Sequence, residues 1–228
     1  MEVLIMKRIV MILVALMLAA LPLVSLAEGA PTVTVNGAAT VSVAADFAKV
    51  SLAVETNAAA VADALSENAD RMAQVLQALE EAGIPAADIV TDRFHVYTQY
   101  DYTGQNNTYN VTNALTVTVR ELGDVGRVID TALSAGANAC NGISFYSNAA
   151  AQANDDALTA AIAEARRKAE LAAAACGKTL GDLVSLTEAY GSYGGVRLAK
   201  AADMAAGTAI LPDGLDFTAN VTATFELK

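Results

Sequence analysis

The chain has 228 residues, a formal net charge of -11 at pH 7 and a sequence pI of about 4.4. A surface this acidic repels phosphate backbones and anionic lipid headgroups, so we expect no nucleic-acid partner. The chain has only two cysteines, which excludes a dense disulfide framework and zinc sites made of four cysteines.

The first segment has the pattern of an export signal. Lys7 and Arg8 form a basic start, an apolar stretch follows, and Ser25-Leu26-Ala27 is a small-x-small cleavage site. The alternative is a retained membrane anchor, but the apolar stretch is short for a bilayer span of about 20 residues. We therefore predict a signal peptide over residues 1–27 and a mature domain over 28–228. The domain would be exported to the periplasm or the extracellular side of the cell envelope, with no stable membrane span after cleavage.

Alternating valines predict strands at the start of the mature chain. Val33 and Val35, and then Val41 and Val43, alternate with polar or small residues on either side of Asn36-Gly37. This is the pattern of two strands separated by a turn. The same period of two continues over residues 50–54 and predicts a half-buried strand.

The apolar period then changes to that of a helix. Apolar residues recur at steps of three and four from Val61 to Leu79, and Gly83 followed by Ile84-Pro85 ends the helix. The alternation of residues predicts two further strands, over about 89–100 and 109–120.

A shorter helix over about 122–135 and a strand over 142–146 come next, before a third helix that ends at Gly177. The third helix has a seam of mostly small residues, which predicts close packing on a sheet or on a second helix. The seam consists of Leu158, Ile162, Ala165, Ala169, Ala172 and Cys176. A strand to about Ala189, a passage without a clean period to Gly214, and a last strand over 217–227 complete the chain.

Two stretches repeat the same order of residues. Gly83 is followed after four residues by Asp88-Ile89-Val90-Thr91, and Gly177 is followed in the same way by Asp182-Leu183-Val184-Ser185. In both stretches a helix ends at the glycine and a pair of strands follows. The recurrence predicts an α+β fold of two β-α-β-β units joined by a middle helix, with a mostly antiparallel sheet packed by helices. The units run over about residues 46–120 and 141–228.

Several short passages, taken in their order and spacing, carry a family resemblance. They are Val33-Thr34-Val35-Asn36-Gly37, Asp46 to Leu52, Gly83 to Thr91, Tyr97 to Tyr102, Asn113 to Val119, Gly136-Ala137-Asn138 with Gly142 to Phe145, and Ala163 to Lys168 with Gly177. Through them the mature chain resembles the SIMPL family of exported bacterial proteins, which includes oxidative-stress-defence and periplasmic immunogenic proteins. The chain departs from the family pattern at Ala45, where a proline is usual, and at Ala39, where a second glycine of the first turn is usual.

The resemblance implies an α+β domain that tends to form ring-like or channel-like oligomers. It also implies a role in envelope stress tolerance, with no established catalytic residues and no defined reaction.

The residues themselves form no convincing catalytic centre. His95 is the only histidine, and it shares a strand face with Arg93 and Tyr97 between Phe94 and Val96, which we expect to point inward. A solvated histidine on a strand is favoured there over a general base.

The acidic residues do not follow the spacing of a calcium-binding loop. Asp88 and Asp182 precede strands at equivalent positions of the repeat, where a carboxylate accepts backbone hydrogen bonds in a turn. We therefore expect no enzyme activity, no cofactor and no metal site.

Six tyrosines mark a candidate assembly surface. Tyr97, Tyr100, Tyr102 and Tyr109 cluster around one predicted hairpin, and Tyr190 and Tyr193 take the equivalent place in the second unit. Tyrosines give rigid contact area at recognition surfaces. The alternative is a hairpin tip that is partly covered by its own rings.

Cys140 and Cys176 allow one disulfide. Cys140 precedes a predicted strand, and Cys176 ends the helix that follows and is expected to run back past that strand. A disulfide and two buried thiols both remain open from the sequence.

These observations lead to a functional hypothesis. We expect a non-enzymatic SIMPL-type protein that forms homo-oligomers and acts in the cell envelope by binding or scaffolding, with an envelope protein as a partner and a role in oxidative or envelope stress tolerance. The alternative is a monomeric periplasmic or extracellular binding module for a small ligand or an envelope protein, which would use the loop over residues 190–214.

Overall fold

The computed structural model describes residues 30–100, 107–189, 195–198 and 212–228. The elements in chain order are β1 (Thr32–Val43), β2 (Phe47–Ala58), α2 (Val61–Glu81), η1 (Ala86–Asp88), β3 (Ile89–Gln99), β4 (Thr108–Val119), η2 (Leu122–Asp124), α3 (Val125–Ser134), β5 (Ala139–Tyr146), α4 (Ala150–Ala175), β6 (Leu180–Ala189), β7 (Gly195–Leu198) and β8 (Pro212–Leu227). The predicted signal peptide lies outside the described residues.

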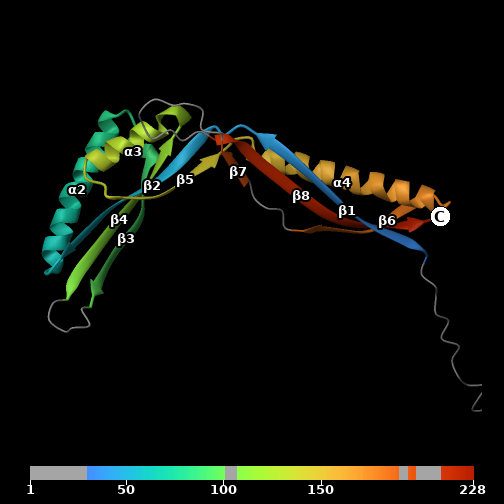
Figure 1. Ribbon diagram of the computed structural model, residues 1–228, viewed down its shortest axis with the longest axis horizontal. Helices are drawn as coiled ribbons and strands as arrows, with labels where there is room; N and C mark the ends of the chain where they lie inside the picture. The colour runs from blue at the N-terminus through green and yellow to red at the C-terminus, as the bar shows by residue number, and fades with distance from the viewer. Residues whose placement is uncertain (1–29, 101–106, 190–194, 199–211) are drawn as a thin grey trace, which may run out of the picture.

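The strands form two antiparallel sheets, which confirms the expected α+β class. One sheet has the strand order β3-β4-β2-β5, and the other has the order β1-β8-β6 with β7 also paired to β8. Figure 1 shows the two sheets as the limbs of an arch, with the helices on the outer side of each limb. We call the limb with α2 and α3 the first limb and the limb with α4 the second limb.

The chain crosses between the limbs twice, and the crossings exchange strands. β5, which begins the second predicted unit, pairs with β2 in the first limb. β1, which precedes the first predicted unit, pairs with β8 in the second limb. The first limb is therefore built from the continuous segment β2 to β5, whereas the second limb joins β1 from the start of the chain to α4 and the strands that follow it.

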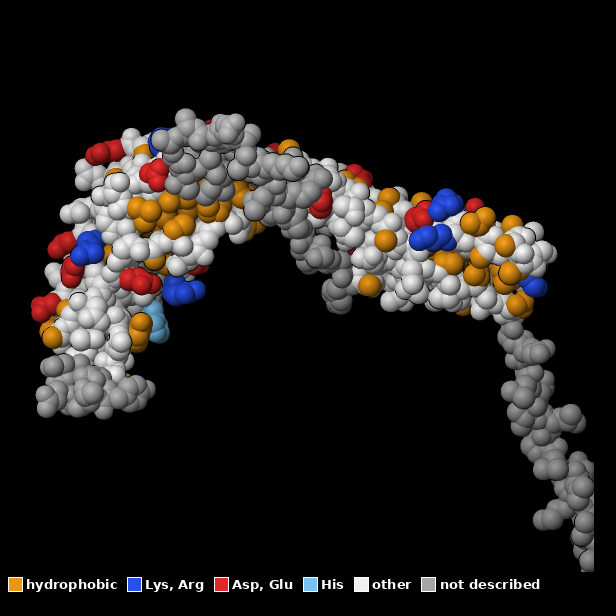
Figure 2. Space-filling view, viewed as in Figure 1, with side chains coloured by type: hydrophobic (Ala, Val, Ile, Leu, Met, Phe, Trp, Pro, Cys, Tyr) orange, Lys and Arg blue, Asp and Glu red, His pale blue; other side chains and the backbone are white. Residues whose placement is uncertain are grey.

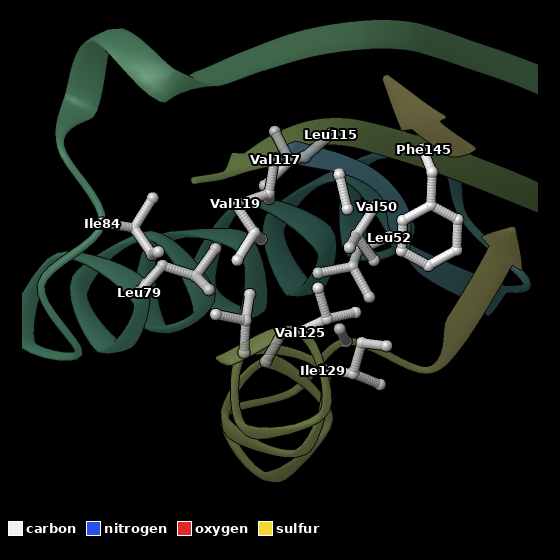
Figure 3. Close-up of a cluster of buried hydrophobic side chains, with 14 of the residues drawn as sticks. Val50, Leu52, Leu79, Ile84, Leu115, Val117, Val119, Val125, Ile129 and Phe145 are labelled. Atoms are coloured by element: carbon white, nitrogen blue, oxygen red, sulfur yellow. The ribbon is translucent and has the colours of Figure 1, made fainter. Parts of the chain in front are cut away.

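The core of the first limb lies between its sheet and the two helices α2 and α3. Figure 3 shows apolar side chains from the sheet meeting those from the helices. Val50 and Leu52 on β2 and Val117 on β4 alternate with polar residues, so they point to the helical side. Leu79 of α2 is fully buried against them. Within the described parts of the chain, no helix covers the opposite face of the sheet, which we call the uncovered face.

The core of the second limb depends on small residues. Every fourth residue of α4 is a buried alanine: Ala153, Ala157, Ala161, Ala165, Ala169 and Ala173. A spacing of four is longer than the helical repeat of about 3.6, so the buried stripe winds slowly around the helix, which suits packing on a twisted sheet. The predicted seam shares Ala165 and Ala169 with this stripe, and its Leu158 and Ile162 are partly buried against the same core. Its last residue, Cys176, is exposed.

One strand replaces the two strands predicted at the start of the mature chain. β1 continues through Asn36-Gly37, and its pairing with β8 is uninterrupted there, with Gly37 opposite Val221. A Cβ atom on Gly37 would lie 2.0 Å from the carbonyl oxygen of Ala161. The glycine is therefore needed for the close approach of α4 to the sheet, and the predicted turn was wrong.

The passage without a clean period contains strand structure as well. β7 continues along the same edge of β8 as β6, and β8 begins at Pro212, earlier than the predicted strand start at residue 217. The connection from this edge into β8 therefore follows Leu198. Most of the 190–214 loop proposed as a ligand site lies outside the described residues.

Candidate functional site

The two crossings between the limbs meet at Asp46. Its carboxylate oxygen Oδ2 accepts a hydrogen bond from the Ser147 hydroxyl at 2.9 Å and from the Asn148 backbone N–H at 2.6 Å. Its own backbone N–H donates to the Tyr146 carbonyl at 2.8 Å. The backbone N–H of Asn148, and to a smaller extent the Ser147 hydroxyl, lower the pKa of Asp46. One side chain thus fastens the β1–β2 connection to the β5–α4 connection.

Aromatic contacts continue this junction onto the uncovered sheet face. Phe47 and Tyr146 are cross-strand partners whose rings stack at 5.3 Å between centroids. The Nζ atom of Lys49 lies 5.1 Å from the centroid of the Tyr146 ring, a cation–π contact. The lysine ammonium is therefore held close to the junction between the two limbs.

A hollow of about 520 Å³ begins beside this cation. Its floor is formed by polar side chains of three neighbouring strands: Lys49, Ser51, Thr116, Thr118 and Ser144. These residues alternate along β2 and β4 with core residues, so they lie on the face that the helices leave uncovered. Figure 1 shows that this face of the sheet is turned toward the inner side of the arch.

Two β-bulges form the sides of the hollow. On β3 the pairing with β4 skips Asp92, and on β5 the pairing with β2 skips Asn141. Gly142, next to the second bulge, has a φ of 146°, which favours glycine. Asp92 and Asn141 both line the hollow. Bulges redirect side chains and are frequent beside functional sites, so the two edge strands contribute one extra polar residue each.

The polar groups of the hollow differ from those farther along the same face. Near the β3–β4 connection, the Asn57 amide donates to Asn110 Oδ1 at 2.7 Å and the Asn110 amide donates to Gln99 Oε1 at 2.9 Å. Within the described residues, the side chains of Ser51, Asp92 and Asn141 make no such hydrogen bonds to other side chains. The hollow therefore offers polar groups that the protein does not use itself.

The tyrosines of the candidate assembly surface are only partly described. Tyr97 and Tyr100 are exposed, at 48% and 68%, and Tyr109 pairs with Thr98 near the end of the β3–β4 hairpin. Tyr102, Tyr190 and Tyr193 lie outside the described residues. In the sequence, Tyr190 and Tyr193 fall between β6 and β7, which continue one edge, whereas the Tyr102 segment connects β3 to β4.

His95 and its neighbours lie on the strand faces that the sequence predicted, but Phe94 and Val96 are not buried. His95 pairs with Thr112 on the uncovered face, and its ring lies 5.6 Å from that of Tyr97. Phe94 and Val96, expected to point inward, are 56% and 38% exposed. They are exposed because β3 is an edge strand, and alternation along a strand cannot show where the covering helices stop.

The repeated aspartates have partners that the sequence analysis missed. Asp88 forms a two-bonded ion pair with Arg120, at 3.0 and 2.6 Å, just beyond the end of β4. Asp182 binds Lys228 at 2.9 Å, just beyond the end of β8. Asp88 lies just before β3, whereas Asp182 lies within β6 near its start, so Asp182 does not precede a strand as predicted. In each limb the aspartate nevertheless holds the basic residue that follows the neighbouring strand. The position of Arg120 and Lys228 at the same place in the repeat was the available signal.

The two cysteines are free and exposed, so they are neither bridged nor buried. Cys140 lies on β5 in the first limb, whereas Cys176 follows the last turn of α4. Figure 1 shows α4 running away from β5 along the second limb. The helix was expected to return past its preceding strand, and the exchange of strands between the sheets is the reason that it does not.

Two edge strands expose large apolar residues. Among the described strands, β3 pairs only with β4, and the outer edge of β8 carries β6 and β7 in succession. Val90 and Phe94 on β3 are 58% and 56% exposed, and Leu183 and Val184 on β6 are 51% and 56% exposed. Every residue of β6 from Asp182 to Ala189 is exposed, so both faces of this strand are open. Edge strands of this kind are templates for pairing with another chain.

The architecture defines an α+β protein of two antiparallel sheets, one covered on one side by α2 and α3 and the other by α4. A family model for SIMPL, described as a protein of unknown function (DUF541), matches residues 33–225. The chain belongs to the SIMPL family.

Individual relatives are similar to this chain over most of its length. The 26 kDa periplasmic immunogenic protein of Brucella melitensis is 29% identical over 164 residues, covering 68% of this chain and 66% of that protein. The uncharacterized protein YggE of Escherichia coli K12 is 29% identical over 168 residues, covering 72% and 68%, and YggE of Edwardsiella ictaluri is 28% identical over 160 residues, covering 68% and 67%. The chain spans about two thirds of the length of these relatives.

The comparisons indicate no enzymatic family. No helix among the described residues is both long and apolar enough to cross a bilayer.

Proposed function

We propose that this chain is an exported, non-enzymatic SIMPL protein that forms homo-oligomers and acts in the cell envelope by binding or scaffolding. Its role there is in oxidative or envelope stress tolerance, together with an envelope protein partner. The proposal divides the chain into a signal peptide over residues 1–27 and a SIMPL domain over 28–228 with two internal units.

The observation that carries self-assembly is the exposure of large apolar residues on two of the edge strands, β3 and β6. Among the described strands, β3 and β6 each present an edge with unpaired backbone groups together with exposed apolar side chains. A β3 edge of one copy pairing with a β6 edge of the next is a head-to-tail contact, which generates rings when the rotation closes. Backbone hydrogen bonds would supply affinity, and the exposed apolar residues would be buried.

The test places a charge on each edge. Phe94→Lys on β3 and Val184→Lys on β6 should each lower the molar mass measured by light scattering of the purified protein, because a lysine on an edge strand opposes pairing. Far-ultraviolet circular dichroism should stay unchanged, since both side chains are exposed. The matched control is Leu171→Lys, because Leu171 is 65% exposed but lies on α4 away from both edges.

Negative-stain images of the unaltered protein should show closed rings. A monodisperse monomer over a hundredfold range of concentration would contradict the assembly. If Leu171→Lys lowers the mass as much as Val184→Lys does, the edge strands are not the contact.

The exposed tyrosines provide a second assembly surface to compare with the edges. The double substitution of Tyr100 and Tyr102 by Ser changes the β3–β4 hairpin end without adding charge to an edge. A drop in mass comparable to that of Phe94→Lys would indicate that the hairpin end also contacts a neighbour. An unchanged mass would restrict assembly to the edges.

Export is supported by the basic start and cleavage pattern of residues 1–27 and by the periplasmic name of the Brucella relative. The amino-terminal sequence of protein recovered from the envelope fraction should begin near Glu28. Full-length protein retained in the membrane fraction would instead indicate an anchor.

The alternative function is a monomeric binding module. The hollow on the uncovered face favours it, because the hollow contains polar groups that are not satisfied by neighbouring side chains. Light scattering distinguishes this alternative from the assembling protein, since a binding module stays monomeric with and without its ligand.

A further inference from the structure

We propose that the hollow on the uncovered face of the first limb binds a neutral saccharide. This inference goes beyond the proposed function and stands whether or not the chain assembles. It is carried by the position, the lining and the charge of the hollow.

Backbone pairing within the sheet fixes the position of the hollow. The sheet is continuous under the floor, with Lys49 opposite Thr118 and Ser51 opposite Thr116, so the floor is fixed by ladder hydrogen bonds. The bulges at Asp92 and Asn141 occur on the two outer strands, at opposite sides of that floor. A volume of about 520 Å³ falls within the range of about 300–1,000 Å³ that is usual for small-molecule sites.

The lining matches a ligand that both donates and accepts hydrogen bonds. Serine and threonine hydroxyls on the floor can do both, the Asn141 amide can do both, Lys49 only donates, and Asp92 as a carboxylate only accepts. A sugar presents neighbouring hydroxyl groups that need this mixture of partners. Hydrogen bonds from those hydroxyls to the Asp92 carboxylate are charge-assisted and should be the strongest contacts.

The charge of the hollow argues against the other ligand classes. Lys49 and Asp92 give it one charge of each sign, so the lining has no net charge. A polyanion would meet one cation on a protein of net charge -11, and association would be opposed by the long-range field. A lipid or other apolar ligand would find little beyond Val90 and the Tyr146 ring, and one side of that ring is already covered by Phe47.

The test is a titration of isotope-labelled protein with three neutral disaccharides, maltose, cellobiose and N,N'-diacetylchitobiose, followed by amide chemical shifts. At least one should give saturable shifts below 50 mM that map to Ser51, Thr116 and Asn141. Asp92→Ala and Asn141→Ala should each weaken that binding at least tenfold. The matched control is Asp63→Ala, because Asp63 lies in the first turn of α2 and does not line the hollow, and it should bind as the unaltered protein does.

A variant that fills the hollow keeps the test decisive. Ser144→Trp places a large ring on the exposed floor without touching the core, and it should abolish the shifts while circular dichroism stays the same. The proposal is overturned if none of the three disaccharides gives saturable shifts at 50 mM, if the shifts map elsewhere, or if Asp92→Ala and Asn141→Ala bind normally. Saturable binding of succinate with no disaccharide binding would also overturn it, because it would show an anion site at Lys49.

Discussion

The limb built on β2 and β4 packs α2 and α3 through leucine, valine and methionine side chains, whereas the limb built on β1 and β8 packs α4 through a row of alanines. Large side chains contribute more buried apolar area per residue. Alanines contribute little area each, but they let the helix backbone lie close to the sheet, and Gly37 extends that closeness to β1. The first limb is therefore sensitive to lost volume, and the second limb is sensitive to added volume.

The same comparison applies to the repeated ion pair. The Asp88 side chain is 9% exposed in its pair with Arg120, whereas the Asp182 side chain is 84% exposed in its pair with Lys228. The same arrangement thus has two environments in the two limbs. An exposed pair of this kind contributes little to stability, while removing the buried partner of the other pair leaves a polar group without its partner.

The largest expected effect is the loss of volume in the first limb. Leu79→Ala should lower the free energy of unfolding by about 2–5 kcal/mol, because Leu79 is fully buried and its removal leaves a cavity. Urea unfolding followed by circular dichroism measures this change. Ala165→Gly is the matching loss in the second limb and should cost roughly 1 kcal/mol, mainly through helix propensity. Equal losses would show that the two limbs do not differ in this way.

The next effect is the addition of volume to the second limb. Gly37→Ala should lower the free energy of unfolding by about 1–3 kcal/mol, because its new methyl group meets the Ala161 carbonyl and α4 must move away. The matched control is Gly123→Ala, because a Cβ atom there meets nothing within 4 Å. A Gly37→Ala protein as stable as the Gly123→Ala protein would contradict the close packing of α4.

The ion pairs should give a smaller, graded effect. Asp88→Asn should lower the midpoint of thermal unfolding more than Asp182→Asn does, because only Asp88 is largely removed from water. The Arg120 guanidinium lowers the pKa of the Asp88 carboxyl, chiefly through its hydrogen bonds. The difference between the two variants should therefore disappear in acid, where the carboxyl is protonated. A larger effect of Asp182→Asn at neutral pH would reverse the comparison.

The smallest effect concerns the junction between the limbs. Because the folded protein lowers the pKa of Asp46 from its ordinary value of 3.8, this group stabilises the fold above that pH, and the contribution is lost as the pH falls below it. Unfolding between pH 5 and pH 2 should therefore depend less on pH in Asp46→Asn than in the unaltered protein.

The variant to compare with Asp46→Asn is Glu164→Gln, on the outer face of α4. Arg167, mainly through its hydrogen bonds, lowers the pKa of Glu164 from 4.5 to about 2, so its stabilisation is lost as the pH falls from about 4.5 to 2. Figure 2 shows basic and acidic side chains side by side over this helix. The Glu164 pair is exposed to solvent, so salt should weaken its contribution. We expect 0.5 M salt to reduce the pH dependence of unfolding due to Glu164 more than the pH dependence due to Asp46. Equal reductions would show that salt screens the Asp46 junction as much as it screens this surface pair.

The sequence by itself determined the α+β class and most of the helices and strands in their order, because the helical and strand periods are local properties of the chain. The order and spacing of its short motifs determined the family. It also placed His95 and Tyr97 on one strand face, since alternation within a strand needs no knowledge of its neighbours. The prediction of a turn at Asn36-Gly37 was wrong. A glycine after an asparagine is typical of a turn, but here the glycine lies within a strand and makes room for the helix packed on it.

Only the tertiary structure decided which strands share a sheet. Pairing of β1 with β8 and of β5 with β2 joins residues far apart in the chain, and nothing in the period of either strand encodes its partner. The separation of Cys140 from Cys176, the exposure of Phe94 and the hollow between two bulges all follow from that pairing. Each depends on which elements cover a face or border an edge, a property of the assembled sheets that no single strand contains.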